Sequence, residues 1–221
     1  MRNLLMSICP IAIWCIVILE AVIAYLLFRQ WQKKKQMIAL LSFLVTIGLI
    51  IDALIIGLGS ALKGDLLAAI SPVRFIAHGL LIPLLFPVCG YALNLKESVM
   101  RIVWIVTGLL MAAGAAEGAC TVLELKEMAG IVRYVSGDAT PAWANLISMV
   151  LSFGTVIPMM IVGVIVWIRQ KTPYLFLSGF IMFVFSALGP ATGNADLIFF
   201  ISMFGELFMV LFLYLYAPKR D

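Results

Sequence analysis

The sequence predicts an all-α integral membrane protein in which seven helices cross the bilayer as one bundle. Hydrophobic residues make up 64% of the 221 residues and charged residues only 12%, whereas soluble domains are typically about 45–50% apolar and about 25% charged. A water-soluble fold cannot cover that much apolar surface. The apolar residues also form long runs separated by short charged or turn-forming breaks. We therefore expect a single transmembrane domain over residues 1–221, in a multi-pass protein of the cell membrane.

Each apolar run is long enough to cross a hydrocarbon core of about 30 Å at about 1.5 Å per helical residue. The predicted spans are 8–28, 37–59, 70–93, 101–120, 144–168, 173–192 and 195–217. The first span ends in the charged segment 29–35 and lacks a small-residue cleavage pattern, so we expect a retained helix rather than a signal peptide. The sixth span is the weakest prediction, because Gly189-Pro190 ends it early.

The third and fourth spans carry residues that shape helices. Pro83 and Pro87 in the third span each remove a helix hydrogen bond, which predicts a bend. Small residues in the fourth span, GLLMAAGAAEGA over 108–119, predict close packing against a neighbouring helix. The fifth span contains Pro158, which has the same bending tendency as the prolines of the third.

The longest break between spans, residues 124–141, is partly apolar. Its apolar side chains include Met128, Ile131 and Val132, and they are compatible with a short helix lying in the membrane interface. An ordinary loop is an equally good interpretation of the same residues. The sequence alone leaves both open.

The bundle has two ends, one on each side of the membrane, and the cations are distributed unevenly between them. One end holds ten of them: Arg29, Lys33, Lys34, Lys35, Lys96, Arg101, Arg169, Lys171, Lys219 and Arg220. The other end holds four: Arg2, Lys63, Lys126 and Arg133. Lys and Arg accumulate on the cytoplasmic side of membrane proteins. We therefore predict an external N-terminus and a cytoplasmic C-terminus.

Several protein classes lack their sequence signatures here. The chain has no basic tail and no nucleic-acid motif, so we expect no nucleic-acid partner. H-E-x-x-H and G-x-S-x-G are absent, and His78 alone cannot form a multi-histidine metal site, so we expect no metal. Cys9, Cys15, Cys89 and Cys120 have no C-x-x-C spacing. Cys9 and Cys120 fall near the same end, and either pair as a disulfide or remain free thiols.

Ionisable side chains inside the predicted spans are costly and are therefore candidates for function. They are Glu20, Asp52, Arg74, His78, Glu117 and Glu206. Helix rise places Asp52, Arg74 and Glu117 in one layer, about 22–24 Å from the cytoplasmic boundary. A buried guanidinium cannot lose its proton and needs an acidic partner, and both acids lie at the matching depth. Arg74 and His78 are four residues apart and share one face of the third helix.

Two interpretations of this layer remain open. In the first, Arg74 holds an anion or positions a carboxylate in an outward-facing polar cavity, which His78 and Glu206 continue towards mid-membrane. In the second, the charges form a structural ion pair that joins three helices. Glu20 and Glu206 lie nearest the midplane, where each is either part of a proton relay or a neutral acid in an interhelical hydrogen bond.

The layout resembles that of seven-helix opsins and receptor-type membrane proteins. Microbial rhodopsins carry an Arg near the outer end of the third helix and a Pro nine residues later, and Arg74 and Pro83 resemble that pair. The chain departs from the opsin pattern at the cofactor. Its last span, 195–217, contains no lysine for a retinal Schiff base, and Ala77 occupies the usual counter-ion position, while Asp52 lies in the second helix. We therefore expect no retinal and no other cofactor.

The polar side chains and the bent helices favour a small-solute transporter or a receptor-like ligand-binding protein over an enzyme. The expected ligand is small and anionic, or lipid-like. One alternative is a membrane-embedded enzyme that acts on a lipid or prenyl substrate, with Asp52, His78 and Glu206 as acid and base, although no nucleophile is evident. Another is a non-catalytic subunit whose buried charges specify helix pairing. An oligomer or a partner subunit is compatible with each of these functions.

Overall fold

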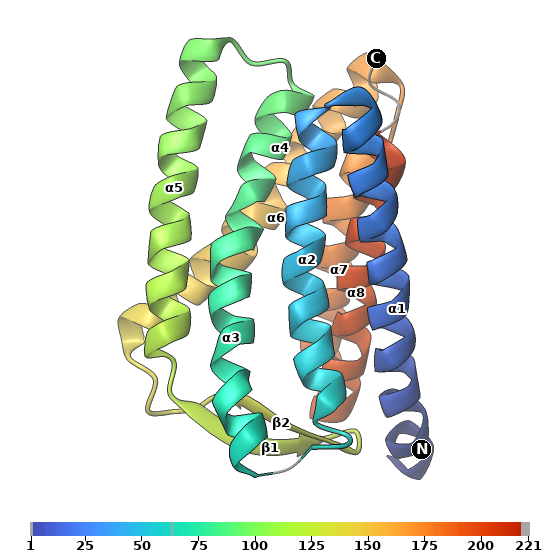
Figure 1. Cartoon of the computed structure of the whole chain (residues 1–221), viewed down its shortest axis with the longest axis vertical. Helices are drawn as coiled ribbons and strands as arrows, with labels where there is room; N and C mark the ends of the chain where they lie inside the picture. The colour runs from blue at the N-terminus through green and yellow to red at the C-terminus, as the bar shows by residue number, and fades with distance from the viewer. Residues whose placement is uncertain (1, 63, 218–221) are drawn as a thin grey trace.

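The computed structural model describes the backbone of residues 2–62 and 64–217, and the side chains of residues 6–62, 64–186 and 193–217. The element order is α1 (Arg2–Lys34), α2 (Met37–Leu58), α3 (Asp65–Leu81), η1 (Ile82–Leu84), α4 (Leu85–Ala92), α5 (Glu97–Cys120), β1 (Leu123–Met128), β2 (Ile131–Ser136), α6 (Ala142–Gln170), α7 (Tyr174–Thr192) and α8 (Ala195–Tyr216). The helices run along one long axis, and α1 begins at the end opposite to that where α8 ends (Figure 1). The predicted helical bundle is confirmed.

Six helical segments of the described chain are long and apolar enough to cross a membrane. They are Met6–Lys34, Met37–Leu58, Asp65–Ala92, Glu97–Cys120, Ala142–Gln170 and Ala195–Tyr216. The apolar stretch identified in α7, Tyr174–Ser186, is shorter, so the seventh crossing stays a prediction. Several helices extend beyond the predicted spans, as α1 does to Lys34. Such extensions are stable because long cationic side chains at helix ends reach water while their stems stay on apolar surface.

The third predicted span is an interrupted helix. Its α-helical hydrogen bonding changes at η1, a 3-10 turn that contains Pro83, because proline has no N–H to continue the ladder. Pro87 lies in the first turn of α4, where α-helical N–H groups have no intrahelical partner to lose. The two prolines therefore have different effects, and only Pro83 coincides with the change in helix type.

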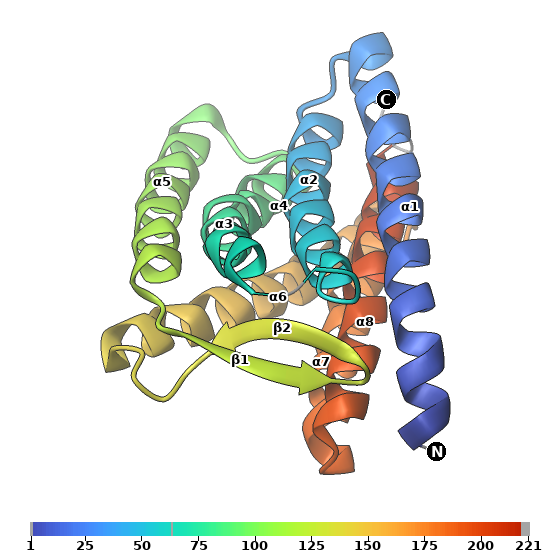
Figure 2. The same cartoon turned by 60° about the horizontal axis from the view of Figure 1, so that its bottom comes forward.

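The segment between α5 and α6 is an antiparallel β-hairpin, which corrects the expectation of an interfacial helix or an ordinary loop. Met128 pairs with Ile131, so Ala129 and Gly130 form a two-residue turn. Both have positive φ, 51° and 80°, as type I′ turns require for strands with a right-handed twist. The β2 sequence IVRYVS is rich in the β-branched and aromatic residues that suit a strand. Figure 2 shows the hairpin lying across one end of the bundle.

Backbone contacts fix the hairpin to the helices. The Ala129 N–H donates to Asp196 Oδ1 of α8 at 2.7 Å, and the Val132 N–H donates to the carbonyl of Gly59 at 3.3 Å. A Cβ at Gly59 would overlap the Val132 carbonyl, so the absence of a side chain permits this approach. The hairpin is thus part of the packed structure.

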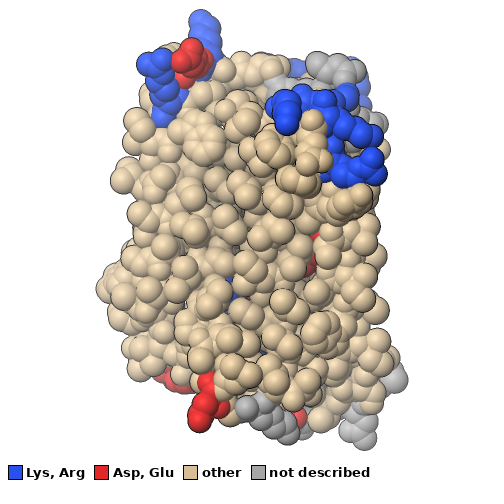
Figure 3. Space-filling model, viewed as in Figure 1, with Lys and Arg blue, Asp and Glu red and all other residues tan. Residues whose placement is uncertain are grey.

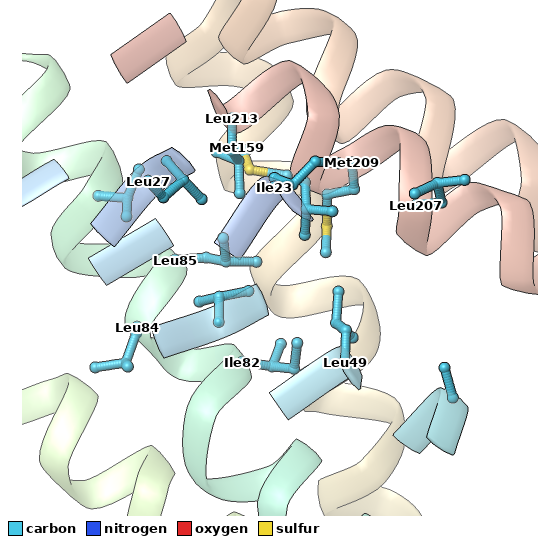
Figure 4. Packing of buried hydrophobic residues seen from close by; sticks show 14 of the residues in the cluster. Ile23, Leu27, Leu49, Ile82, Leu84, Leu85, Met159, Leu207, Met209 and Leu213 are labelled. Atoms are coloured by element: carbon cyan, nitrogen blue, oxygen red, sulfur yellow. The ribbon is translucent and has the colours of Figure 1, made fainter. Parts of the chain in front are cut away.

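The main hydrophobic core joins helices that are distant in the sequence. Figure 4 shows Leu27 of α1, Leu49 of α2, Leu85 of α4, Met159 of α6 and Leu213 of α8 in this cluster. All five side chains are almost completely buried. Their dispersion contacts hold the bundle together, because lipid removes most of the hydrophobic driving force between helices.

Helices α3 and α5 approach each other through glycines. A Cβ at Gly79 would overlap the backbone of Gly114, and a Cβ at Gly114 would overlap that of Gly79. Gly118 lies equally close to the backbone of α3. The close packing predicted from the small residues of the fourth span is confirmed.

Charged side chains gather at the two ends of the bundle, and the broad side between them in Figure 3 is almost free of charge. We call one end the basic end: it carries Arg29, Lys33, Lys34, Lys35, Lys96, Arg101, Arg169 and Lys171. The end with the hairpin we call the acidic end: it carries Asp65, Glu124, Glu127, Asp138 and Asp196, together with the cations Lys126 and Arg133 of the hairpin. All four cysteines are free thiols, so Cys9 and Cys120 do not pair.

Candidate functional site

The site begins at a buried ion pair between α2 and α3. Arg74 Nε lies 2.7 Å from Asp52 Oδ1, and the two residues are only 6% and 7% exposed. Arg74 Nη1 also donates to the Tyr134 carbonyl of β2 at 3.0 Å. The sequence placed Arg74 and Asp52 at one depth, and their contact agrees with that placement. The guanidinium also links both helices to the hairpin.

A cavity of about 180 Å³ adjoins this pair, and we call it the polar cavity. It is lined by Asp52, Arg74, Phe75, His78, Gly79, Glu117, Ser148, Leu151, Ser152 and Glu206. Five of the six side chains singled out from the sequence therefore surround one space. They come from α2, α3, α5 and α8, and α6 supplies the two serines.

Two carboxyl groups of the polar cavity have no cationic partner in the described part of the chain. Glu117 Oε1 accepts a 3.3 Å hydrogen bond from Thr121 Oγ1, which directly follows the end of α5. Glu206 Oε2 has no hydrogen-bond partner among the described residues. Both residues are at least nine-tenths buried. Glu117 and Glu206 therefore differ from Asp52, because Arg74 balances the charge of Asp52.

A second cavity, of about 200 Å³, continues from the first, and we call it the apolar cavity. Its lining includes Leu49, Ile82, Leu85, Phe153, Val156, Met182, Phe183 and Met209. It shares His78, Ser152 and Glu206 with the polar cavity. The two cavities together form an amphipathic space, with its ionisable groups at one side.

The cavities reach the outer surface of the bundle along α6. Ser148 and Ser152 line the polar cavity and are exposed, while Phe153 lines the apolar cavity and is 51% exposed. The first half of α6 leaves this side of the bundle open. The opening lies between the two charged ends.

Glu20 does not join the other five candidates. It is completely buried in α1, neither of its carboxyl oxygens has a hydrogen-bond partner among the described residues, and it lines neither cavity. Helix rise gives depth but not direction around the bundle, which is why the sequence grouped Glu20 with the others.

Three contributors to this region were not predicted from the sequence: Ser148, Ser152 and Arg133. The serines are four residues apart, so their spacing already placed them on one helix face. Arg133 of β2 lies with its guanidinium 4.4 Å from the centre of the Phe199 ring. Burial, with a further effect from the positive charge of Arg74, lowers the pKa of Arg133 to about 9. The guanidinium therefore stays charged at neutral pH.

The hydroxyl of Ser152 is not paired with a side-chain base among the described residues. An activated serine would donate its hydroxyl proton to a base. Ser152 Oγ instead donates to the carbonyl of Ser148 at 2.9 Å, and no hydrogen bond joins it to His78 within the described residues.

Comparison with protein-family models gave no match, and comparison with curated proteins found no similar sequence.

Proposed function

We propose that this multi-pass membrane protein binds a small ligand in the two adjoining cavities, as a carrier or a receptor-like binder. The observation that carries the proposal is the convergence of Asp52, Arg74, His78, Glu117 and Glu206 on one space. A purely structural ion pair needs only Asp52 and Arg74. Placing further buried carboxyl groups beside it without cationic partners is costly, and a ligand that satisfies them offsets that cost.

The opening along α6 supports access from the side. Ser148, Ser152 and Phe153 stand at the surface that faces lipid in a membrane bundle. A ligand dissolved in the bilayer reaches both cavities there without crossing the charged ends. The hairpin lies across the acidic end (Figure 2), which supports a lateral path as an alternative to the outward-facing entrance expected from the sequence.

A matched pair of variants tests the proposal. Ser152→Trp fills the junction of the two cavities without changing any charge, and its exposed position favours folding. Ser98→Trp is the control, because Ser98 is exposed on α5 and lines neither cavity. Purified protein in lipid nanodiscs is screened against a small-molecule library by thermal shift. We expect at least one ligand whose binding is lost in Ser152→Trp and retained in Ser98→Trp.

The same preparations separate the functions. Uptake of the ligand into proteoliposomes indicates a carrier, and binding without uptake indicates a receptor-like protein. Conversion of a lipid or prenyl compound, followed by mass spectrometry, would instead favour the enzyme. If every ligand found binds equally to both tryptophan variants, the cavities are not the binding site and the proposal fails.

A further inference from the structure

We propose that the ligand is an organic cation, an amine with an apolar body, whose ammonium group pairs with the carboxylates of Glu206 and Glu117. This inference rests on the proposed function and names the chemical class that the cavities accept. It differs from the small anion that Arg74 suggested in the sequence. The reason is the arrangement of charge around the polar cavity.

The charges that line the polar cavity favour a cation. Three carboxyl groups and one guanidinium line it, and the 2.7 Å contact between Arg74 and Asp52 cancels one charge of each sign. Glu117 and Glu206 remain. Arg133 of the hairpin lies over Phe199, outside the lining of the cavity. It forms no ion pair with either acid in the described part of the chain, although its positive charge acts on Glu206 from outside the cavity.

An anion meets two obstacles in the same place. Arg74 already donates from Nε to Asp52 and from Nη1 to the Tyr134 carbonyl, so two of its five N–H groups are engaged and its charge is balanced by Asp52. An added anion would also lie beside Glu117 and Glu206 and would oppose the ionisation of both carboxyl groups, whereas a cation favours their charged form. An ammonium group, in contrast, donates up to three hydrogen bonds, and Glu206 Oε2 lacks a partner.

The apolar cavity determines the rest of the ligand. Leu49, Ile82, Val156 and Met209 among its walls offer no hydrogen bonds, so the part of the ligand they contact is hydrocarbon. Each cavity alone is smaller than the roughly 300 Å³ at which small-molecule sites begin. A ligand that fills both has its charge at one end. Glu206, which lines both cavities, stands where the two parts of the ligand meet.

A metal ion fits these carboxyl groups less well. No three His, Cys, Asp or Glu side chains of the described residues lie close enough together to hold one. An alkylammonium needs no coordination sphere, and its apolar body adds contacts that a metal ion lacks.

Three compounds with the same hydrocarbon skeleton test the sign of the charge. Phenylbutylamine, phenylbutanol and phenylbutanoate are cationic, neutral and anionic at neutral pH. Their binding to the protein in nanodiscs is measured by equilibrium dialysis, with empty nanodiscs as the reference. We expect the amine to bind at least tenfold more tightly than the alcohol, and the carboxylate to bind most weakly.

Conservative variants identify the acids involved. Glu206→Gln and Glu117→Gln keep the size of the side chain, so we expect each to lower amine affinity more than alcohol affinity and thereby to narrow the difference between the two compounds. Glu97→Gln is the matched control, because Glu97 lies exposed at the basic end and pairs with Arg101. It should change neither affinity.

The outcomes separate this inference from the proposed function. An amine that binds no better than the alcohol overturns the inference, as does equal loss of amine and alcohol binding in the glutamine variants. If phenylbutanoate binds most tightly, the inference is also overturned. The ligand would then be an anion held by Arg74, and the proposed function would remain intact. If none of the three binds above the empty nanodiscs, the inference fails. The proposed function is then decided by the Ser152→Trp comparison.

Discussion

Two ion pairs of equal length have very different surroundings. The Arg74–Asp52 and Arg101–Glu97 contacts are both 2.7 Å, but the side chains of the first pair are 8% and 9% exposed and those of the second 75% and 83%. Water screens the exposed pair, whereas the buried charges depend on each other and on the Tyr134 carbonyl. Removing one partner of a buried pair leaves an uncompensated charge.

This contrast gives a prediction at the residue scale. Asp52→Leu should lower the free energy of unfolding by about 3–5 kcal/mol, because it leaves the Arg74 guanidinium buried and unpaired. Glu97→Gln should change it by less than about 1 kcal/mol. Reversible unfolding in mixed detergent micelles measures both. The double variant Asp52→Leu/Arg74→Met should recover most of the loss, and a double variant no more stable than Asp52→Leu would contradict the explanation.

The pairing of Asp52 with Arg74 could be predicted from the sequence, because charged residues are rare in the spans and helix rise gives their depths. The same reasoning identified three further candidate residues, which are Glu117, His78 and Glu206. It did not identify Ser148 and Ser152, since a serine in a helix commonly donates to a carbonyl of its own preceding turn, as Ser152 does. Such a serine gives no sequence signal of which space it faces.

At the scale of elements, the packing of α3 on α5 depends on backbone contact at Gly79 and Gly114. A side chain at either position has no space, because the opposite backbone occupies the place of its Cβ. Gly108 lies on α5 too, but a Cβ there meets nothing within 4 Å. The same helix therefore supplies both a sensitive and a tolerant glycine.

We predict that Gly114→Leu destabilises the bundle by about 1–3 kcal/mol or more, since overpacking forces the helices apart. Gly108→Leu should be close to neutral or slightly stabilising, because leucine favours helix more than glycine does. Thermal unfolding of the two variants in the same nanodiscs compares them directly. Equal melting temperatures would show that α3 and α5 do not pack through these glycines.

The hairpin is the element for which the prediction from the sequence was wrong. Its apolar residues were compatible with a helix or a loop, and the turn residues Ala129-Gly130 lack the Asn-Gly or Asp-Gly pair that most strongly marks a type I′ hairpin. Its position depends on long-range contacts with Gly59 and Asp196. Those contacts lie 67 or more residues away along the chain, beyond the reach of local patterns.

At the scale of the molecule, the separation of the basic and acidic ends sets the expected orientation. Cations collect at one end of the bundle (Figure 3), and the hairpin lies across the other (Figure 2). Because Lys and Arg are retained on the cytoplasmic side, the basic end should face the cytoplasm. A seventh crossing by α7 is part of the same prediction, since it puts the two ends of the chain on opposite sides.

Cysteine labelling in intact cells tests this orientation. Ser60→Cys lies at the acidic end and Ser98→Cys at the basic end, and both positions are exposed. Each is placed in a chain whose exposed Cys15 and Cys120 are replaced by alanine. A membrane-impermeant maleimide should label Ser60→Cys directly, and Ser98→Cys only after permeabilisation. The reverse pattern would invert the topology, and labelling of both from outside would rule out an odd number of crossings between them.

The sequence by itself determined the membrane class, the helical segments, the charge asymmetry and the depths of Asp52, Arg74 and Glu117. These properties depend on composition and on distance along a helix, and both are local. Only the tertiary structure decided that Glu206 meets them while Glu20 does not, that Arg74 is already paired, and that α6 leaves the cavities open to the side. Those properties depend on the rotation and tilt of each helix, which arise from packing between residues far apart in the chain.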